Sequence, residues 1–207
     1  MKATHYKQEH IIEAAIKRFA HFGIQKTTLS EIADDLALSR QALFYYFPDK
    51  PSLIAAVEDK IIAEYIAALQ KQFGSTPNIE AALLKLAEVR MTFFGKYFML
   101  ASHLEAGGTT LSGKSLAQVK QTLQESEVAL LAQLFEQGIA SGELQPIEPL
   151  KTANLLLHTL NALAHCVREK AIPPESSAVE GVFQKQKEVL QLFYNGLKNP
   201  GYGRADH

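Results

Sequence analysis

Residues 28–47 read TLSEIADDLALSRQALFYYF and contain two short amphipathic segments joined by a tight turn. Thr28 is followed three residues later by Glu31, a capping-box pattern in which each side chain satisfies a free backbone N–H at the start of a helix. Ser39 is placed to cap a second short helix. Two short helices with a tight turn between them are the sequence form of a helix-turn-helix.

A further apolar helix is predicted just before this stretch. Its hydrophobic residues recur at the spacing of one helical face, namely Ile12, Ala15, Ile16, Phe19 and Phe22. Gly23 follows them and is expected to end the helix. The three helices together predict a small helix-turn-helix domain over residues 1–50.

A helix-turn-helix that binds DNA needs apolar residues where its helices cross and polar residues on the face that enters the major groove. The apolar set is Ile32, Ala33, Leu36, Leu38 and Leu43. Arg40 and Gln41 are the predicted base readers, because arginine can bind guanine and glutamine adenine through two hydrogen bonds each. The side chains better suited to phosphate are Thr28, Ser39, Tyr45, Tyr46 and Lys50.

The same region matches a family pattern at many positions. They are Ala14–Ala15, Phe19, Gly23, Thr27–Thr28, Ile32–Ala33, Leu38–Ser39, Leu43–Phe44–Tyr45–Tyr46–Phe47, Lys50 and Leu53. On these residues the stretch from Ile11 to Val57 resembles the TetR family of bacterial regulators. The resemblance implies an N-terminal DNA-binding domain, a helical C-terminal domain that dimerises and binds a small molecule, and repression as the usual outcome.

Some positions depart from the family pattern. The family usually has glycine in the turn where Ala37 stands. A left-handed backbone there would cost alanine about 1 kcal/mol relative to glycine, so a slightly reshaped turn is expected. Phe44 replaces a tyrosine that is common in the family, and Tyr46 stands where the family often has histidine.

Helical spacing continues through the rest of the chain, and no convincing strand alternation is present. Further helices are predicted over 51–73, 79–94, 95–106, 115–141, 149–170 and 177–197. The sequence therefore predicts an all-α fold of about nine helices. The second domain, for effector binding and dimerisation, is assigned to residues 51–200, and residues 201–207 are expected to form a frayed tail.

The last predicted helix has a broad apolar face, interrupted only by Gln186. It consists of Val179, Val182, Phe183, Val189, Leu190, Phe193 and Leu197. A monomer would leave part of such a face in water. We therefore expect a homodimer, whose two recognition helices could read the half-sites of a palindromic operator in double-stranded DNA, about 34 Å apart.

An uncharged polar stripe runs along the helix predicted over 149–170. Its members, Asn154, His158, Asn161 and His165, recur at steps of four, three and four residues. Such hydrogen-bonding side chains suit partial burial, either at the edge of a dimer seam or in a ligand cavity. In the second case His158, Asn161 and His165 are candidate ligand contacts. The separation of seven positions between His158 and His165 argues against a shared metal ion, and no metal site or cofactor is predicted.

Aromatic side chains cluster just before a glycine-rich stretch at 107–113. The cluster comprises Phe93, Phe94, Tyr97, Phe98, Met99 and His103. Core packing is the commoner explanation for such residues, but a cluster beside a mobile flap would suit an apolar or aromatic effector. The candidate effector contacts in this cluster are Phe94, Tyr97, Phe98 and His103.

Composition limits the other possibilities. The 207 residues are 47% hydrophobic with a formal net charge of −1, so DNA binding must depend on a few placed cations. No apolar run is long enough to span a membrane, and the single cysteine excludes an internal disulfide, so a cytoplasmic protein is expected. Phosphate-binding loops, zinc-protease motifs and nucleophile elbows are absent, which argues against an enzyme. A helical ligand-binding or interaction protein without DNA binding is the alternative.

Overall fold

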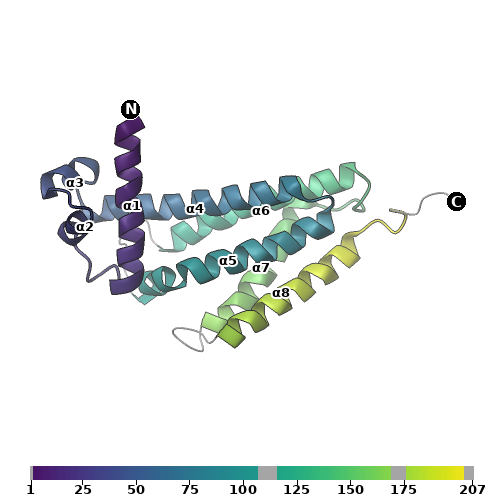
Figure 1. The fold of residues 1–207 in the computed structure, drawn as a ribbon. Coiled ribbons are helices and arrows are strands. Elements are labelled where there is room, and N and C mark those ends of the chain that lie inside the picture. The colour runs from purple at the N-terminus through teal and green to yellow at the C-terminus, as the bar shows by residue number, and fades with distance from the viewer. Residues whose placement is uncertain (1, 107–115, 169–175, 203–207) are drawn as a thin grey trace. The chain divides into compact units, whose positions relative to one another are not determined.

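In the computed structural model, the described part of the chain, residues 2–106, 116–168 and 176–202, folds into eight helices without a strand (Figure 1). The helices are α1 (Lys2–Phe22), α2 (Leu29–Asp35), α3 (Arg40–Tyr46), α4 (Lys50–Ser75), α5 (Ile79–Ala106), α6 (Leu116–Ala140), α7 (Pro149–Arg168) and α8 (Ser176–Leu197). The predicted all-α fold is confirmed. No helix in the described ranges is long and apolar enough to cross a bilayer.

One predicted helix boundary is wrong. The sequence predicts separate helices that meet at Gly95, but α5 runs through this residue without a break. A glycine in a helix interior costs only about 1 kcal/mol relative to alanine. Val89 and Leu100, on either side of Gly95, are buried, and their packing outweighs that cost. The described residues therefore contain eight helices rather than about nine.

The chain divides into two compact units that interleave along the sequence. The first unit comprises Met1–Glu64 and Phe94–Thr122, and the second comprises Tyr65–Phe93 and Leu123–His207. The domain boundary after residue 50 stays a prediction. The glycine-rich stretch at 107–113 and most of the tail expected to fray, residues 203–207, lie outside the described residues.

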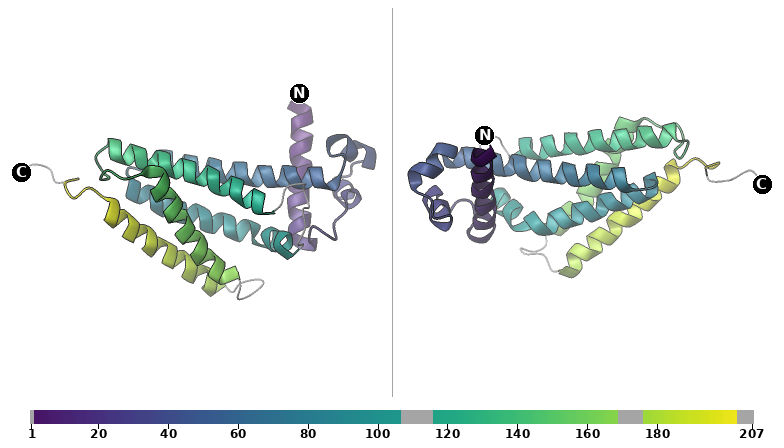
Figure 2. Two further views of the ribbon diagram at one scale, coloured as in Figure 1. Left: turned by 180° about the vertical axis from the view of Figure 1, so that it is seen from behind. Right: turned by 45° about the horizontal axis from the view of Figure 1, so that its top comes forward.

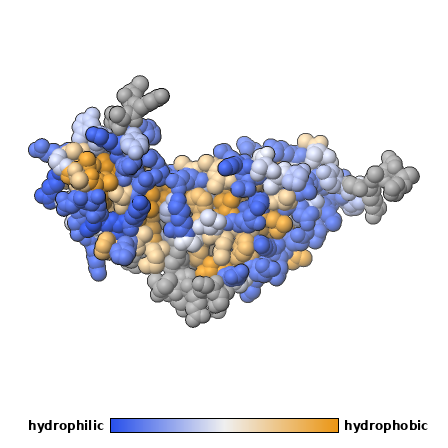
Figure 3. Space-filling view, in the orientation of Figure 1, coloured by the Kyte–Doolittle hydropathy of each residue, from blue (hydrophilic) through white to orange (hydrophobic). Residues whose placement is uncertain are grey.

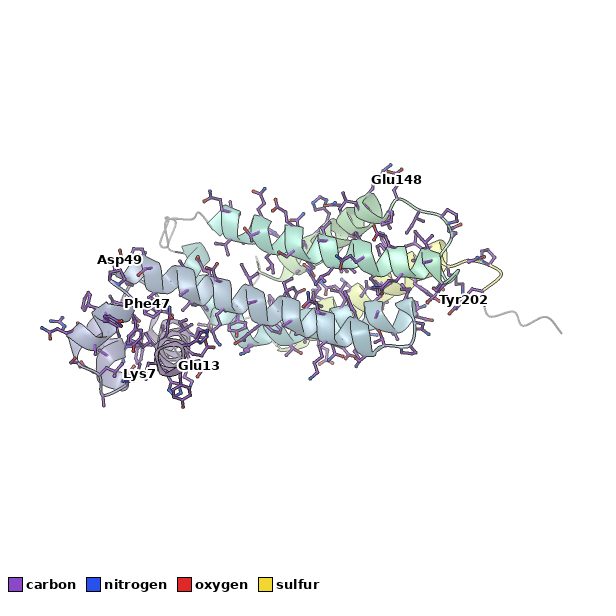
Figure 4. The ribbon with its side chains drawn as sticks, turned by 90° about the horizontal axis from the view of Figure 1, so that it is seen from above. Lys7, Glu13, Phe47, Asp49, Glu148 and Tyr202 are labelled. Carbon is purple, nitrogen blue, oxygen red and sulfur yellow. The ribbon has the colours of Figure 1, made fainter. Side chains whose placement is uncertain are left out.

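In the first unit, α2 packs against both α1 and α3 (Figure 2). The fully buried side chains of this packing are Ile11, Ala15, Phe19, Ile32, Ala33 and Leu43. Phe47 ends α3 and is also buried, and Asp49 lies just before α4 (Figure 4). The carboxylate of Asp49 accepts a hydrogen bond from the backbone N–H of Ser52 at 2.8 Å, which caps α4.

The second unit has its own hydrophobic core, to which α4, α5, α6, α7 and α8 contribute. Its fully buried side chains include Leu69, Leu86, Leu131, Phe135, Leu156, Leu157 and Leu160. α7 and α8 lie side by side (Figures 1 and 2). Gln186 of α8 is buried against α7 and donates to the backbone carbonyl of Leu160 at 3.0 Å. This bond offsets the cost of burying the amide.

Candidate nucleic-acid interface and effector site

Both caps predicted for the helix-turn-helix are formed. The backbone N–H of Glu31 donates to Oγ1 of Thr28 at 3.3 Å, and the backbone N–H of Thr28 donates to Oε2 of Glu31 at 2.7 Å, which completes the capping box. The hydrogen bonds from Thr28 lower the pKa of Glu31. Oγ of Ser39 accepts from the backbone N–H of Ala42 at 3.1 Å and caps α3.

The turn between α2 and α3 has a left-handed backbone at Ala37, where φ is 52°. The N–H of Leu38 donates to the carbonyl of Ala33 at 2.9 Å, and the N–H of Ala37 donates to the carbonyl of Asp34 at 3.1 Å. This pairing is that of a Schellman motif, which usually has glycine in the left-handed position. The expected reshaping of the turn is therefore wrong, because alanine takes the glycine conformation.

The exposed side chains of α3 are Arg40, Gln41, Phe44 and Tyr45, while Leu43 on the opposite face is fully buried and anchors the helix. Arg40 and Gln41 are both exposed in the first turn. Nε of Arg40 donates to Oγ of Ser30 in α2 at 2.5 Å, so α2 helps to orient the guanidinium. Adjacent positions of α3 thus expose a cation and an amide, the two groups best suited to bind guanine and adenine.

The predicted phosphate contacts differ in accessibility. Tyr45 is 78% exposed, and its ring meets the half-buried ring of Tyr46 edge to face at a centroid distance of 5.2 Å. Nζ of Lys50 donates to the backbone carbonyl of Gln25 at 3.3 Å, and burial lowers the pKa of Lys50. The hydroxyl of Thr28 donates to Glu31 at 2.9 Å. Thr28 and Lys50 would have to share or exchange these partners to bind phosphate.

Arg18 of α1 holds α2 in place. Its Nη1 lies 2.7 Å from both carboxylate oxygens of Asp35, and its Nη2 lies 3.2 Å from Oε1 of Glu31. The guanidinium also lies over the ring of Phe22, 4.9 Å from the centroid. Because Glu31 belongs to the capping box, the same carboxylate connects the start of α2 with α1.

A chain of charged side chains connects α1, α4 and α5 within the first unit. Lys60 of α4 pairs with Glu9 of α1 and with Glu64, whose Oε1 lies 3.0 Å from Nζ of Lys60. Oε2 of Glu64 accepts hydrogen bonds from the hydroxyl of Tyr97 at 2.8 Å and from Lys96 at 3.1 Å. Burial opposes the ionisation of Glu64, but the hydrogen bonds from Lys60, Tyr97 and Lys96 outweigh burial and lower its pKa to about 2.

The aromatic candidates for effector binding are only partly described. Tyr97 is buried, with its hydroxyl bound to Glu64, and Phe94 is half-buried. Both residues belong to the first unit. The side chains of Phe98 and His103 lie outside the described residues. The hydroxyl of Tyr97 therefore connects α5 with α4.

A partly buried polar cluster lies in the second unit, where α4, α5, α6 and α7 each contribute one side chain. Arg90 of α5 donates from Nη1 to Oε1 of Glu127 at 2.6 Å and from Nη2 to Oδ1 of Asn161 at 2.5 Å. Tyr65 donates its hydroxyl to the same oxygen of Glu127 at 2.5 Å. Burial and the charge of Glu127 raise the pKa of Tyr65 well above its ordinary value. We call Tyr65, Arg90, Glu127 and Asn161 the Arg90 cluster.

The polar stripe of α7 makes contacts with two other helices of the second unit. Asn161 accepts from Arg90 of α5, and Nε2 of His158 lies 2.8 Å from the amide nitrogen of Gln124 in α6. An amide nitrogen only donates, so Nε2 of His158 accepts this bond. His165 is exposed. The structure thus brings His158 and Asn161 into contact with α6 and α5, and the role of the stripe in ligand binding stays a prediction.

Sequence reasoning misses three members of the Arg90 cluster. Tyr65 fits the apolar stripe of its helix, whereas Arg90 and Glu127 are charged residues at positions where helical spacing requires a buried side chain. Lone charges at buried positions are rare unless they are paired, and this is the signal that could have identified them. In the described ranges no group of three or more His, Cys, Asp and Glu residues could hold a metal ion.

Comparisons with known proteins agree with this geometry. Residues 11–57 match the family model for bacterial regulatory proteins of the tetR family. A transcriptional regulator of known structure from Cytophaga hutchinsonii is 30% identical and has a TM-score of 0.81, with 93% of this chain and 99% of that chain covered. The HTH-type transcriptional regulator RutR of Escherichia coli K12 is 28% identical over 151 residues, which cover 72% of this chain and 69% of RutR.

A more distant likeness extends over the whole fold. SmeT, the repressor of the Stenotrophomonas maltophilia multidrug efflux pump SmeDEF, is 16% identical and has a TM-score of 0.65, with 94% of this chain and 91% of that chain covered. A complex of SmeT with triclosan gives a TM-score of 0.67, with 96% of this chain and 93% of that chain covered. At this identity the likeness shows the fold alone.

Proposed function

This chain belongs to the TetR family of bacterial regulatory proteins, and we propose that it is a repressor whose affinity for operator DNA is lowered by a small-molecule effector. As a member of this family it is a DNA-binding transcriptional regulator and not an enzyme. Membership also excludes the alternative of a helical interaction protein without DNA binding. The sign of regulation and the response to an effector are the parts that we propose.

The observation that carries the proposal is the exposed outer face of α3, with Arg40 and Gln41 in its first turn. We propose that Arg40 reads guanine and Gln41 reads adenine in the major groove. The proposed phosphate contacts are Thr28, Ser39, Tyr45, Tyr46 and Lys50. Because the formal net charge is −1, these few placed groups have to supply the affinity that a basic protein gains from bulk charge.

We propose that a homodimer forms through α7 and α8. Most of the apolar face predicted for the last helix packs against the core of the same chain, so it is not the surface left for a partner. The exposed apolar side chains are instead Leu155 of α7, 59% exposed, and Leu192 of α8, 71% exposed. Hydrophobic side chains are exposed between hydrophilic ones over the second unit (Figure 3). A second copy that covers these leucines would remove apolar surface from water. It would also supply the second recognition helix that a palindromic operator needs, about 34 Å from the first.

The effector is proposed to be apolar or aromatic. SmeT, which has the same fold, forms a complex with triclosan, and this supports an effector of that kind by analogy. An effector that binds better to a conformer with another spacing of the recognition helices shifts the population, and DNA affinity falls by the same factor. In the first unit the candidate contacts remain Phe94, Tyr97, Phe98 and His103, and in the second unit the separate candidates remain His158, Asn161 and His165.

The test is binding of the purified protein to the DNA upstream of its own gene, measured by fluorescence anisotropy. Arg40→Ala should weaken binding to this DNA by about 1–3 kcal/mol, or about 5- to 150-fold, because a base contact is lost. Binding to unrelated DNA should change less. Lys71→Ala removes an exposed cation near the end of α4 and is the matched control, expected to bind like the wild type.

Three results would contradict parts of the proposal. Equal affinity of the wild type for upstream and unrelated DNA would argue against an operator in that region. Full specific binding by Arg40→Ala would dismiss Arg40 as a base reader. An effector that binds without changing operator affinity would leave the DNA-binding function in place and refute the switch.

A further inference from the structure

We propose that the guanidinium of Arg90 is the polar anchor of the effector, and that the effector is a neutral, mainly apolar molecule with a hydrogen-bond acceptor such as a carbonyl oxygen. This inference rests on the proposed function, because it names the chemistry of the effector which that function requires. It adds Tyr65, Arg90 and Glu127 to the effector site and gives Asn161 a specific role there.

The Arg90 cluster is costly to place in a hydrophobic core. Glu127 is 3% exposed and the side chain of Arg90 is 13% exposed, so two charges are largely removed from water. Buried ion pairs often stabilise a fold less than hydrophobic residues of the same volume would. Leu131 and Leu157, which belong to the same core, are fully buried. Stability alone therefore does not account for the charges, and ionisable groups in such a place are candidates for binding.

One donor of the Arg90 guanidinium is unsatisfied. Its Nε is buried and has no hydrogen-bond partner within the described part of the chain. Nη1 and Nη2 are held by Glu127 and Asn161, which fix the plane of the group. A buried N–H without an acceptor is unfavourable, and an oxygen of a bound ligand would satisfy it. The geometry thus provides a directional binding group for an acceptor atom.

Glu127 determines which charge the ligand can carry. Its carboxylate already neutralises Arg90, with Oε1 at 2.6 Å from Nη1. A carboxylate ligand on the same guanidinium would lie close to this second negative charge and be repelled. A neutral acceptor avoids the repulsion. The rings of Tyr65 and Phe93 meet edge to face at a centroid distance of 5.2 Å, which offers an aromatic surface to the apolar part of the ligand.

The cluster also connects the core with α7. Asn161 is exposed on α7, so its bond to Arg90 lies at the exposed end of the cluster. The proposed ligand approaches from this end. An acceptor that binds the guanidinium changes how firmly Arg90 holds Asn161. Because α7 is the helix proposed to form the dimer, occupancy of the site would bias the dimer between its conformers.

The test uses the full-length protein labelled with nitrogen-15 and two matched probes, benzamide and benzoate, which differ in charge at one functional group. Binding is followed through the Nε–H signal of Arg90 by NMR, assigned with the variant Arg90→Lys. Benzamide should shift this signal in a saturable way and bind at least about tenfold more tightly than benzoate. Equal binding of the two probes, or no saturable shift with benzamide, would overturn the proposal.

Two variants separate binding from folding. Arg90→Lys keeps a positive partner for Glu127 but lacks Nε, and the double variant Arg90→Met/Glu127→Leu removes both charges together, which leaves no unpaired ion. Each folded variant should lose benzamide affinity by about tenfold or more, and unchanged affinity in either would overturn the anchor. Operator binding is measured on the same samples. If the wild type binds operator DNA but benzamide does not shift its Arg90 signal, the proposal for Arg90 is wrong and the repressor function stands. If the wild type binds benzamide as expected but does not bind operator DNA, the repressor function is wrong.

Discussion

Ala37 holds a backbone conformation that an alanine adopts at a cost. Its φ of 52° brings Cβ close to the following carbonyl group, a contact that glycine lacks. The turn keeps this form because the N–H groups of Ala37 and Leu38 satisfy two carbonyls at the end of α2. The tight turn of the DNA-binding unit is therefore a local source of strain, introduced by a single methyl group.

Replacing Ala37 by glycine should stabilise the protein. We expect Ala37→Gly to raise the free energy of unfolding by about 1 kcal/mol, because the steric cost at positive φ disappears. Urea unfolding followed by circular dichroism measures the change. Ala42→Gly, inside the right-handed helix α3, is the matched control and should lower stability by about 1 kcal/mol. A loss of stability in Ala37→Gly would show that the turn is not strained.

Among the helices, α4 is connected with α1 and α5 of the first unit through Lys60 and Glu64. Lys60 pairs with Glu9 of α1, and Glu64 accepts hydrogen bonds from Tyr97 and Lys96 of α5. Salt bridges at exposed surfaces contribute little, but networks with several partners are more stabilising. These contacts hold α4, the helix that follows α3, against α1 and α5.

The contribution of Glu64 to the stability of the folded protein should depend on pH. Its pKa is lowered from an ordinary value of 4.5 to about 2, so the folded state favours the ionised form. The resulting stability is present above the unfolded pKa and is lost as the pH falls from 4.5 towards 2. We expect the wild type to be more stable than Glu64→Gln near neutral pH, with a difference that shrinks through this window. Thermal unfolding as a function of pH measures the difference.

An exposed carboxylate on the same unit provides the control. Glu13→Gln on α1 changes a side chain in water, and its difference from the wild type should stay small at each pH. If the difference between wild type and Glu64→Gln were the same at neutral and at acid pH, the contacts with Lys60, Lys96 and Tyr97 would not stabilise the ionised form.

In the second unit, the pairing of α5 with α6 through Arg90 and Glu127 predicts an asymmetry between single and double variants. Arg90→Met should lower the free energy of unfolding by about 3–5 kcal/mol, because it leaves the buried carboxylate of Glu127 unpaired. Arg90→Met/Glu127→Leu should be near the wild type or more stable. Chemical denaturation of both proteins measures these values, and equal losses in the two would mean that the charges do not act as a pair.

At the scale of the whole molecule, a single chain carries one recognition helix, and a palindromic operator needs two. The proposed dimer face has exposed leucines on two neighbouring helices, Leu155 of α7 and Leu192 of α8. A second copy would cover both leucines, so a charge at each position tests the dimer.

The double variant Leu155→Glu/Leu192→Glu should be monomeric, because it would bury two carboxylates without partners in the interface. Sedimentation equilibrium measures the mass, and operator affinity should fall by at least about tenfold when one half-site contact is lost. Ala67→Glu, at an exposed position of α4, is the control and should leave the dimer intact. A dimeric double variant with normal operator binding would locate the interface elsewhere.

Helix ends near the DNA-binding unit were predictable because their signals are local. Thr28 and Glu31, like Ser39 and Ala42, are three residues apart and meet at the start of a helix. The sequence spacing alone therefore predicts the contact. Gly95 marks the limit of such reasoning. Its local preference indicates a break in α5, but the packing of the surrounding helix decides otherwise.

The family, the all-α class and the exposure of Arg40 and Gln41 on α3 follow from the sequence alone, because caps, helical spacing and a short motif relate residues that are close along the chain. The Arg90 cluster was decided only by the tertiary structure. Arg90 meets Glu127 and Asn161 across separations of 37 and 71 residues. The spacing of apolar residues predicts which face of a helix is buried. It does not predict which other helix packs against that face, so the partner of a buried charge is known only from the packed structure.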